Sequence, residues 1–257
     1  MEARYARVAR PLHHAFGVVP LPVPGRSCMI RTVSETGSTN EDLLAEARAG
    51  APEGTWLRAE AQSGGRGRVG RIWLSPPGNL YASTIVCLHD GEPEPATLAL
   101  VAAVALEEVA SAYARPARLQ LKWPNDLMAG TSKLAGILLE RAGDAVVVGF
   151  GVNLAHRPEN LDRPTASLVS LGRSAPDPES FLANLVEAFG RWVARWRGEG
   201  VAPVRARWLE RAHPIGTALT ANGGQGLFEG LDAQGALLLR RPGGAVDTIR
   251  AGDVFLA

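Results

Sequence analysis

The residues best suited to chemistry lie in two short segments, and the first contains both lysines of the chain. Of 27 basic residues only Lys122 and Lys133 are lysines, and both lie in KWPNDLMAGTSK. An ammonium is a compact donor, whereas a guanidinium is a planar fork, so a chain that otherwise uses arginine keeps lysine where only an ammonium fits. The alternative is that these two lysines remain, close together, by chance. Asp126 lies between them and suits Mg²⁺ held jointly with phosphates. The alternative to a metal-binding role for Asp126 is a Pro-Asn-Asp turn closed by a salt bridge.

The second segment is a loop rich in glycine and arginine, GGRGRVGR, at residues 64–71. It contains G-x-G-x-x-G, but the following WLSPPG excludes the helix that a dinucleotide-binding turn needs. The lysine-bearing strand and H-R-D loop of a protein kinase are missing too. The glycine N–H groups, with Arg66, Arg68 and Arg71, can instead close over an anion. The alternative, a solvated basic turn, would leave like charges to repel one another.

Periodic patterns predict the elements that must position these two segments. Ser38 or Thr39 can cap a helix, Pro95 opens a long apolar helix, and Asp177 starts a helix whose apolar face predicts core packing. Helices are predicted at 41–49, 96–114, from 177 to about 196, and 204–211, and strands at 29–36, 55–61, 79–88, 118–123, 133–141 and 145–154. The last strand is apolar enough to be central in a sheet.

Composition excludes several classes of protein. A net charge of +1 is too small for general nucleic-acid binding, which needs a basic surface, so anion recognition must be local. Cys28 and Cys87 form no disulfide framework or metal cluster, which indicates free thiols in a reducing compartment. No apolar run reaches the length of a membrane span, and the N-terminus lacks a signal-peptide core. We therefore expect a cytoplasmic protein without a membrane partner.

Three regions are predicted along the chain. Residues 1–28 are rich in proline and arginine and predict an extended arm, too short for a helix-turn-helix domain. Residues 29–213 form the main domain, and residues 214–257 change to short strands with glycine turns. Five short strands in so few residues predict a small β-barrel.

Taken together, the motifs resemble those of biotin protein ligases. The matching segments are GSTN at 37–40, QSGGRGRVGRIW at 62–73, KWPND at 122–126, KLAGIL at 133–138 and GFGVN at 149–153. They occur in the order and spacing of that family, and the similarity extends to the C-terminal strands. The resemblance implies an α+β fold in which helices back a mixed sheet, as in class II aminoacyl-tRNA synthetases, with an SH3-like barrel at the C-terminus.

The resemblance also implies a reaction. Biotin and ATP, with Mg²⁺, give biotinyl-5′-AMP, and a lysine of a biotin carboxyl carrier protein, from acetyl-CoA carboxylase or a related carboxylase, then takes the biotin. Without a DNA-binding domain the chain resembles the monofunctional type, so no DNA partner is expected, while a homodimer is possible. The alternatives are a lipoate or octanoate ligase of the same fold, which would need an apolar tunnel, and a non-catalytic regulator that binds biotinyl-AMP.

Roles for individual residues follow from the same resemblance. Those expected to bind biotin are Ser38, Thr39, Asn40, Gln62, Gly65, Arg66 and Lys133. Those expected to bind ATP are Arg68, Arg71, Trp73, Asn125, Asn153 and, less specifically, Lys122. Lys133, Arg66 and Arg68 are the expected catalytic residues, and Asp126 is the expected Mg²⁺ ligand. Hydroxyls and an amide suit the neutral ureido ring, which both donates and accepts hydrogen bonds.

The scarcity of lysine generates a test. If only an ammonium fits at position 133, Lys133→Arg should slow adenylate formation by about 10²–10³-fold, as when a transition-state donor is lost. Lys122→Arg should slow adenylate formation less, because a lysine that binds phosphate or has a structural role is easier to replace. Pyrophosphate release at saturating biotin and ATP measures both, after circular dichroism establishes folding. Near-normal turnover by Lys133→Arg would remove the catalytic role from this residue.

Overall fold

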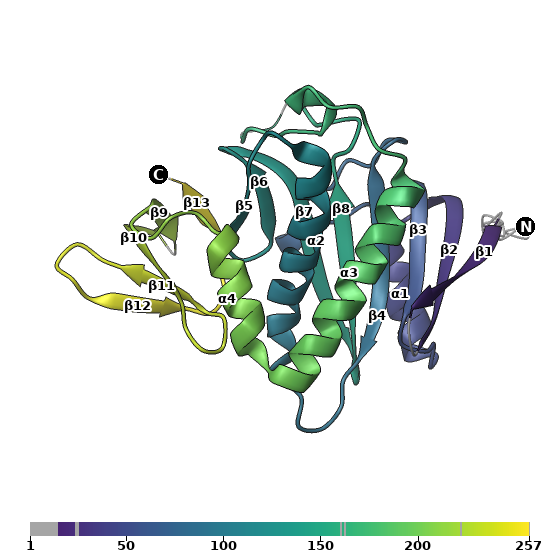
Figure 1. Ribbon diagram of the computed structural model, residues 1–257, viewed down its shortest axis with the longest axis horizontal. Helices are drawn as coiled ribbons and strands as arrows, with labels where there is room; N and C mark the ends of the chain where they lie inside the picture. Colours follow the sequence, from purple (N-terminus) through teal and green to yellow (C-terminus); the bar gives the residue numbers. More distant parts are fainter. Residues whose placement is uncertain (1–14, 24–25, 160, 162, 222, 257) are drawn as a thin grey trace, which may run out of the picture.

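The computed structural model describes residues 15–23, 26–159, 161, 163–221 and 223–256, with side chains from Met29 onward. An eight-stranded mixed sheet forms its centre (Figure 1). The strand order is β1 (Ala15–Val23), β2 (Arg26–Thr36), β3 (Thr55–Gln62), β4 (Leu80–Cys87), β8 (Ala145–Val152), β7 (Ser132–Ala142), β6 (Asp126–Ala129) and β5 (Leu119–Lys122). Only β2 and β3 pair in parallel among these described strands. The mixed sheet confirms the predicted fold class.

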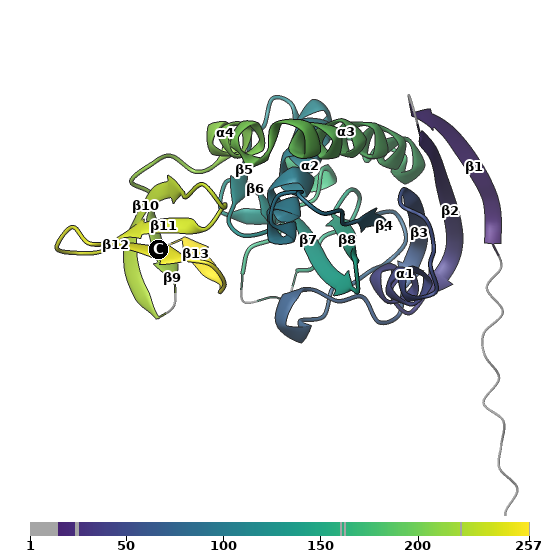
Figure 2. The same cartoon turned by 90° about the horizontal axis from the view of Figure 1, so that it is seen from below.

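Helices cover both faces of this sheet, as Figure 2 shows. On one face lie α2 (Leu98–Ala114), α3 (Pro178–Glu199) and α4 (Val201–Arg211). On the other lies α1 (Thr39–Arg48), which connects the parallel pair β2 and β3. Two buried clusters result: a large one under α2, α3 and α4, and a smaller one under α1. Because both faces are covered, β4 and β8 are apolar and buried along almost their whole length, so β8 is central as predicted.

Helix α3 begins at its predicted capping residue, and α2 begins close to its predicted start. Asp177 caps α3 by accepting from Ser180 N–H at 2.9 Å, with Pro178 in the first turn. A short 3-10 turn at Pro95–Thr97 leads into α2. Trp196 of α3 is fully buried and donates from Nε1 to Thr97 Oγ1 at 2.8 Å, which fixes α3 to the start of α2. The apolar face of α3 therefore packs in the core, as expected.

The C-terminal strands form a second sheet. Its order is β12 (Val246–Ile249), β11 (Leu237–Arg240), β10 (Gly224–Leu231), β9 (Ala218–Ala221) and β13 (Val254–Leu256), all antiparallel. Five strands were predicted here and five are present in the described part of this region, while closure into a barrel and the boundary at residue 214 stay predictions. Trp208 of α4 packs edge-on against Phe228 of β10, which joins this sheet to the main core.

Some expectations need correction. The predicted arm is partly regular, since residues 15–23 pair with β2 as an edge strand, while residues 1–14 lie outside the described residues. Strand β6 was not predicted, because four residues after a proline carry no periodic signal. Helix α4 begins at Val201, three residues before the predicted start. By length and composition Pro95–Ala114 could cross a membrane, but 67% of its apolar window is buried within the protein, as in a core helix.

The helical layer should dominate stability. Leu106 of α2 is completely buried, so Leu106→Ala should lower the free energy of unfolding by about 2–5 kcal/mol through lost burial and a cavity. Urea titration followed by tryptophan fluorescence measures this. Leu161→Ala removes the same atoms from a residue that is 48% exposed and should change little. Equal effects of the two variants would contradict the assigned core.

Candidate active site

A cavity opens on the face of the sheet that carries α1. Three parts of the main domain line it: the start of α1, the arginine loop after β3, and residues of β5 to β8. The C-terminal strand β13 also contributes to the lining. Its lining includes the predicted residues Ser38, Thr39, Asn40, Gln62, Arg66, Arg68, Arg71, Trp73, Lys122, Asn125, Asp126 and Lys133. Residues of four motifs are thus brought together, and Gly149 and Gly151 of the fifth motif also line the cavity. Gly65 and Asn153 are not among the lining residues.

One end of the cavity is polar and uncharged. Gln62 at the end of β3 accepts from Thr39 N–H at 2.9 Å and donates from Nε2 to Ser75 Oγ at 3.1 Å. Ser38 occupies the N-cap position of α1, yet its hydroxyl makes no capping bond. Ser83 of β4, 2.7 Å from Thr39 Oγ1, completes this end. Hydroxyls and an amide held in this way can read a neutral ligand group that both donates and accepts.

Glycines bring backbone close to this cavity. A Cβ on Gly149 would lie 2.1 Å from Asn40 Oδ1, and a Cβ on Gly151 would lie 2.6 Å from the indole of Trp73. A Cβ on Gly65 would meet Trp73 O at 2.5 Å and Ser75 Oγ at 2.6 Å. Contacts under 3.0 Å are essentially never seen for real Cβ atoms, so a larger residue would shift a backbone carbonyl at Gly65 and the side chains of Asn40 or Trp73 at the other two positions. Gly65 therefore allows the loop to pack closely on Trp73 and Ser75, although it does not line the cavity.

The other end of the cavity is cationic and is organised by Asp126. Its carboxylate pairs with Lys122 Nζ at 3.1 Å and with Lys133 Nζ; Asp126 and Lys133 are buried, and the Lys122 side chain is 10% exposed. Lys122 also donates to Val254 O at 2.8 Å, and Lys133 lies over the ring of Trp73, 5.4 Å from its centroid. Burial would raise the pKa of the Asp126 carboxyl, but Lys133 and Lys122 outweigh burial and hold that pKa below its ordinary value. The salt link considered as the alternative is therefore present.

This arrangement does not suit Asp126 as a resident Mg²⁺ ligand. Oδ2 of Asp126 faces Lys122 and Oδ1 faces Lys133, so both oxygens already accept from ammonium groups. A divalent cation bound to the same carboxylate would meet the positive charge of both ammonium groups, which opposes its binding. No group of three or more His, Cys, Asp or Glu side chains able to hold a metal occurs within the described part of the chain. Asp126 instead positions the two lysines.

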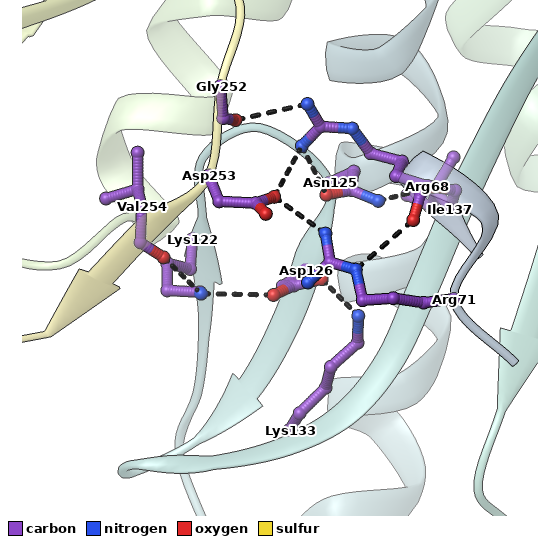
Figure 3. A network of polar contacts seen from close by, with 10 residues as sticks. All are labelled: Arg68, Arg71, Lys122, Asn125, Asp126, Lys133, Ile137, Gly252, Asp253 and Val254. Atoms are coloured by element: carbon purple, nitrogen blue, oxygen red, sulfur yellow. Dashed lines mark hydrogen bonds and ion pairs between the residues drawn. The ribbon is translucent and has the colours of Figure 1, made fainter. Parts of the chain in front are cut away.

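Protein carboxylates gather the arginine loop, as Figure 3 shows for two of its members. Arg71 pairs with Asp253 at 2.7 Å, and Arg68 reaches Asp253 at 3.7 Å and donates to Gly252 O at 3.1 Å. Arg66 pairs with Glu41 in the first turn of α1 at 2.9 Å. These three pairs are partly exposed, so an anionic ligand can compete for the guanidinium groups. The protein's own acids pair with all three arginines here, and closure of the loop over an anionic ligand stays a prediction.

Of the residues predicted to contact a nucleotide, Trp73 and Asn125 line the cavity, whereas Asn153 does not. Trp73 lines the cavity, and its Nε1 is buried with no partner among the described residues. Asn125 lies beside Arg68 and accepts at Oδ1 from Arg68 Nη1 at 3.4 Å. The Nδ2 group of Asn125 donates to Ile137 O at 2.6 Å. Asn153 is 2% exposed and donates to Ala166 O at 3.0 Å. It therefore fixes the segment after β8 and does not reach the cavity.

Sequence reasoning missed several residues of the site. Ser83 belongs to a buried apolar strand, where a hydroxyl among branched residues was the only signal. Asp253 comes from the distant C-terminal sheet, and nothing in its neighbourhood pointed to the arginine loop. Arg163 and Phe255 also line the cavity. All except Ser83 come from segments that reach the cavity only through the packing of distant parts of the chain.

The Asp253 contacts generate a prediction about the loop. Asp253→Ala should speed tryptic cleavage within residues 66–71 by about two- to fivefold, because a partly exposed ion pair contributes little but limits loop opening. Asp247→Ala removes another aspartate of the C-terminal sheet, which pairs with Arg241 at 2.7 Å, and should leave that rate unchanged. Mass spectrometry identifies the cleavage sites. Equal rates in wild type and Asp253→Ala would mean that Asp253 does not restrain the loop.

Comparisons with known proteins agree with this geometry. Residues 33–153 match the Biotin/lipoate A/B protein ligase family, and residues 220–257 match the Biotin protein ligase C terminal domain. The biotin–[acetyl-CoA-carboxylase] ligase of Paracoccus denitrificans is 41% identical, over 87% of this chain and 98% of the relative. That of Mycobacterium tuberculosis is 40% identical, over 86% of each chain.

A solved structure shares the fold. It is that of the biotin protein ligase from Aquifex aeolicus in complex with biotin and ATP, with a TM-score of 0.79 and 24% identity, covering 89% of this chain and 99% of the other. The family match covers both the main sheet and the C-terminal strands. With two relatives at 40% identity or more along nearly their whole length, this chain belongs to the biotin protein ligase family.

Proposed function

We propose that the cavity activates biotin with ATP and transfers it to a carrier protein. In the first step a biotin carboxylate oxygen attacks the α-phosphorus of ATP, giving biotinyl-5′-AMP and pyrophosphate. In the second, the ε-amine of a carrier lysine attacks the acyl carbon, an amide forms and AMP leaves. The observation that carries this proposal is that one cavity is lined both by neutral hydroxyl and amide groups and by a cationic cluster, because biotin has a neutral ureido ring and a carboxylate.

The uncharged end suits the ring of biotin. Ser38, Thr39 and Gln62 offer hydroxyl and amide groups, and Ser83 adds a further hydroxyl. A lipoate or octanoate ligase would instead need an apolar tunnel, since buried polar groups left unpaired by an alkyl chain are costly. The polar lining therefore favours biotin over those alternatives.

The cationic end suits the reacting groups. Arg66 and Arg68 would leave their carboxylate partners to hold the biotin carboxylate and the α-phosphate, with Arg71 beside them. Lys133 would stabilise the charge that develops on the phosphate, and Asp126 keeps this ammonium in place. A Cβ at Gly136 would lie only 3.0 Å from Lys133 Nζ, so the slot for this group is narrow. Catalysis is then positioning and charge stabilisation, without an enzyme nucleophile.

The nucleotide would lie between the loop and the strand ends. Trp73 has a buried Nε1 without a partner among the described residues and an indole face for adenine, and the amide of Asn125 also lines the cavity. Lys122, held by Asp126 and Val254 O, would face phosphate. Mg²⁺ would enter as the MgATP substrate, coordinated by phosphate oxygens. We expect the acceptor to be the carboxyl carrier domain of acetyl-CoA carboxylase or a related carboxylase, in the cytoplasm.

Biotin-dependent release of pyrophosphate from ATP tests this function. Wild type should release pyrophosphate with biotin and Mg²⁺, and should not when biotin is replaced by lipoate or octanoate. With a purified carrier domain, mass spectrometry should detect one added biotinyl group, which is lost when the acceptor lysine is changed to arginine. A chain that binds biotin but releases no pyrophosphate would be a regulator, and release with lipoate would identify the other ligase class.

A further inference from the structure

A chain of hydrogen bonds leads from the edge of the molecule to the uncharged end of the cavity. Asn40 Nδ2 donates to Glu140 Oε2 on β7 at 2.9 Å, and Ser83 Oγ donates to Asn40 Oδ1 at 2.7 Å. Ser83 Oγ lies 2.7 Å from Thr39 Oγ1. Three of these residues are nearly or fully buried and line the cavity, whereas Glu140 is half-buried and does not line it. We call Glu140, Asn40, Ser83 and Thr39 the Glu140 chain.

The direction of every bond in the Glu140 chain is set at its outer end. An ionised carboxylate can only accept, so Asn40 must turn its Nδ2 toward Glu140 and its Oδ1 inward. The inward Oδ1 can also only accept, so Ser83 gives it its single proton. Ser83 is then an acceptor toward Thr39, which must donate across the 2.7 Å contact.

Close packing keeps Asn40 in this orientation. It is 4% exposed, and a Cβ at Gly149 of β8 would lie 2.1 Å from its Oδ1, so the amide lies directly against the strand backbone. An amide turned the other way would aim Oδ1 at the Glu140 carboxylate and place two acceptors at hydrogen-bond distance. That arrangement is strongly unfavourable in a buried site.

The consequence appears at the cavity. The protons of Ser83 and Thr39 are both used within the chain, and Thr39 Oγ1 can offer Gln62 Oε1, 3.2 Å away, only the proton that it gives Ser83. Gln62 is held as well, because its Oε1 accepts from Thr39 N–H and one N–H of its Nε2 donates to Ser75. The second N–H of this amide stays a donor. The hydroxyls of Thr39 and Ser83 therefore turn lone pairs toward a ligand, so these two groups accept from its N–H groups.

We propose that Glu140 is a positioning residue that fixes this hydrogen-bond polarity from outside the cavity. It thereby selects a ligand whose ring presents N–H groups at Thr39 and Ser83, as the ureido group of biotin does. The inference rests on the proposed function and adds to it the residue that decides which way the reading hydroxyls face. Glu140 itself touches no ligand.

An exchange of oxygen and nitrogen between two positions tests the proposal. Asn40→Asp alone places two carboxylates 2.9 Å apart. Glu140→Gln alone can either accept from or donate to Asn40, so the polarity is no longer enforced. The double variant restores a donor opposite an acceptor, because the new amide at position 140 can donate to the new carboxylate at position 40, whose other oxygen accepts from Ser83. It also keeps the net charge and nearly the volume of wild type.

Calorimetric titration with biotin, and KM values from pyrophosphate release, provide the readouts. Asn40→Asp should weaken biotin binding by about 10- to 100-fold, and Glu140→Gln by about threefold, as for lost bonds to charged groups. The double variant should bind within about threefold of wild type, since coupled residues in one network are not additive. The KM for ATP should stay within about twofold in all three, because the effect is confined to the ring end.

Asn184→Asp is the matched control, since Asn184 Nδ2 also donates, to Tyr113 Oη at 2.9 Å, on the surface of α3. It should not alter biotin binding. Thermal unfolding of each variant reports loss of folding separately. The proposal is overturned if the double variant binds biotin no better than Asn40→Asp, or if the KM for ATP rises together with that for biotin. If wild type itself neither binds biotin nor releases pyrophosphate, the proposed function fails and this inference falls with it.

Discussion

One buried carboxylate organises the cationic half of the site. Asp126, at the start of β6, holds Lys122 at the end of β5 and Lys133 at the start of β7, so three strand ends share a single counter-charge. Removing one partner of such a group commonly costs about 3–5 kcal/mol, because the remaining charge stays buried. One carboxylate and two ammonium groups leave an excess of one positive charge at the cavity. The fold therefore maintains a place for an anion, and the rest of the site is arranged around it.

The C-terminal sheet is coupled to the same place by different means. Val254 O accepts from Lys122, and Asp253 pairs with Arg71, so two consecutive residues of the chain contact both the buried triad and the arginine loop. The triad is rigid because its members are buried, whereas the loop pairs are partly exposed and exchangeable. This division suits a reaction in which a fixed charge stabilises the reacting phosphate while mobile arginines enclose it.

The opposite end of the cavity depends on polarity without charge. Thr39, Ser83 and Gln62 are already hydrogen-bonded to neighbours before a ligand arrives. Preassigned donors and acceptors limit reorganisation on binding and reject groups that cannot match them. The glycines of β8 add to this, because Gly149 and Gly151 let Asn40 and Trp73 lie directly on the sheet. A neutral ring and an anionic tail on one substrate fit these two ends.

Local patterns in the sequence were enough to predict the kinds of element and the family of motifs. Periodicity placed α2, α3 and β8 because burial on one or both faces imposes a repeat that can be read locally. Spacing gathered Lys122, Asp126 and Lys133 because they lie within one strand–turn–strand unit. Which residues from distant segments contact that unit depends on how the strands pack in three dimensions. Asp253 and Asn153 show this: one reaches the arginine loop from the last strand, and the other turns away to hold a backbone carbonyl. Long-range packing selects such contacts, and no local pattern encodes the direction in which a side chain points once distant strands meet.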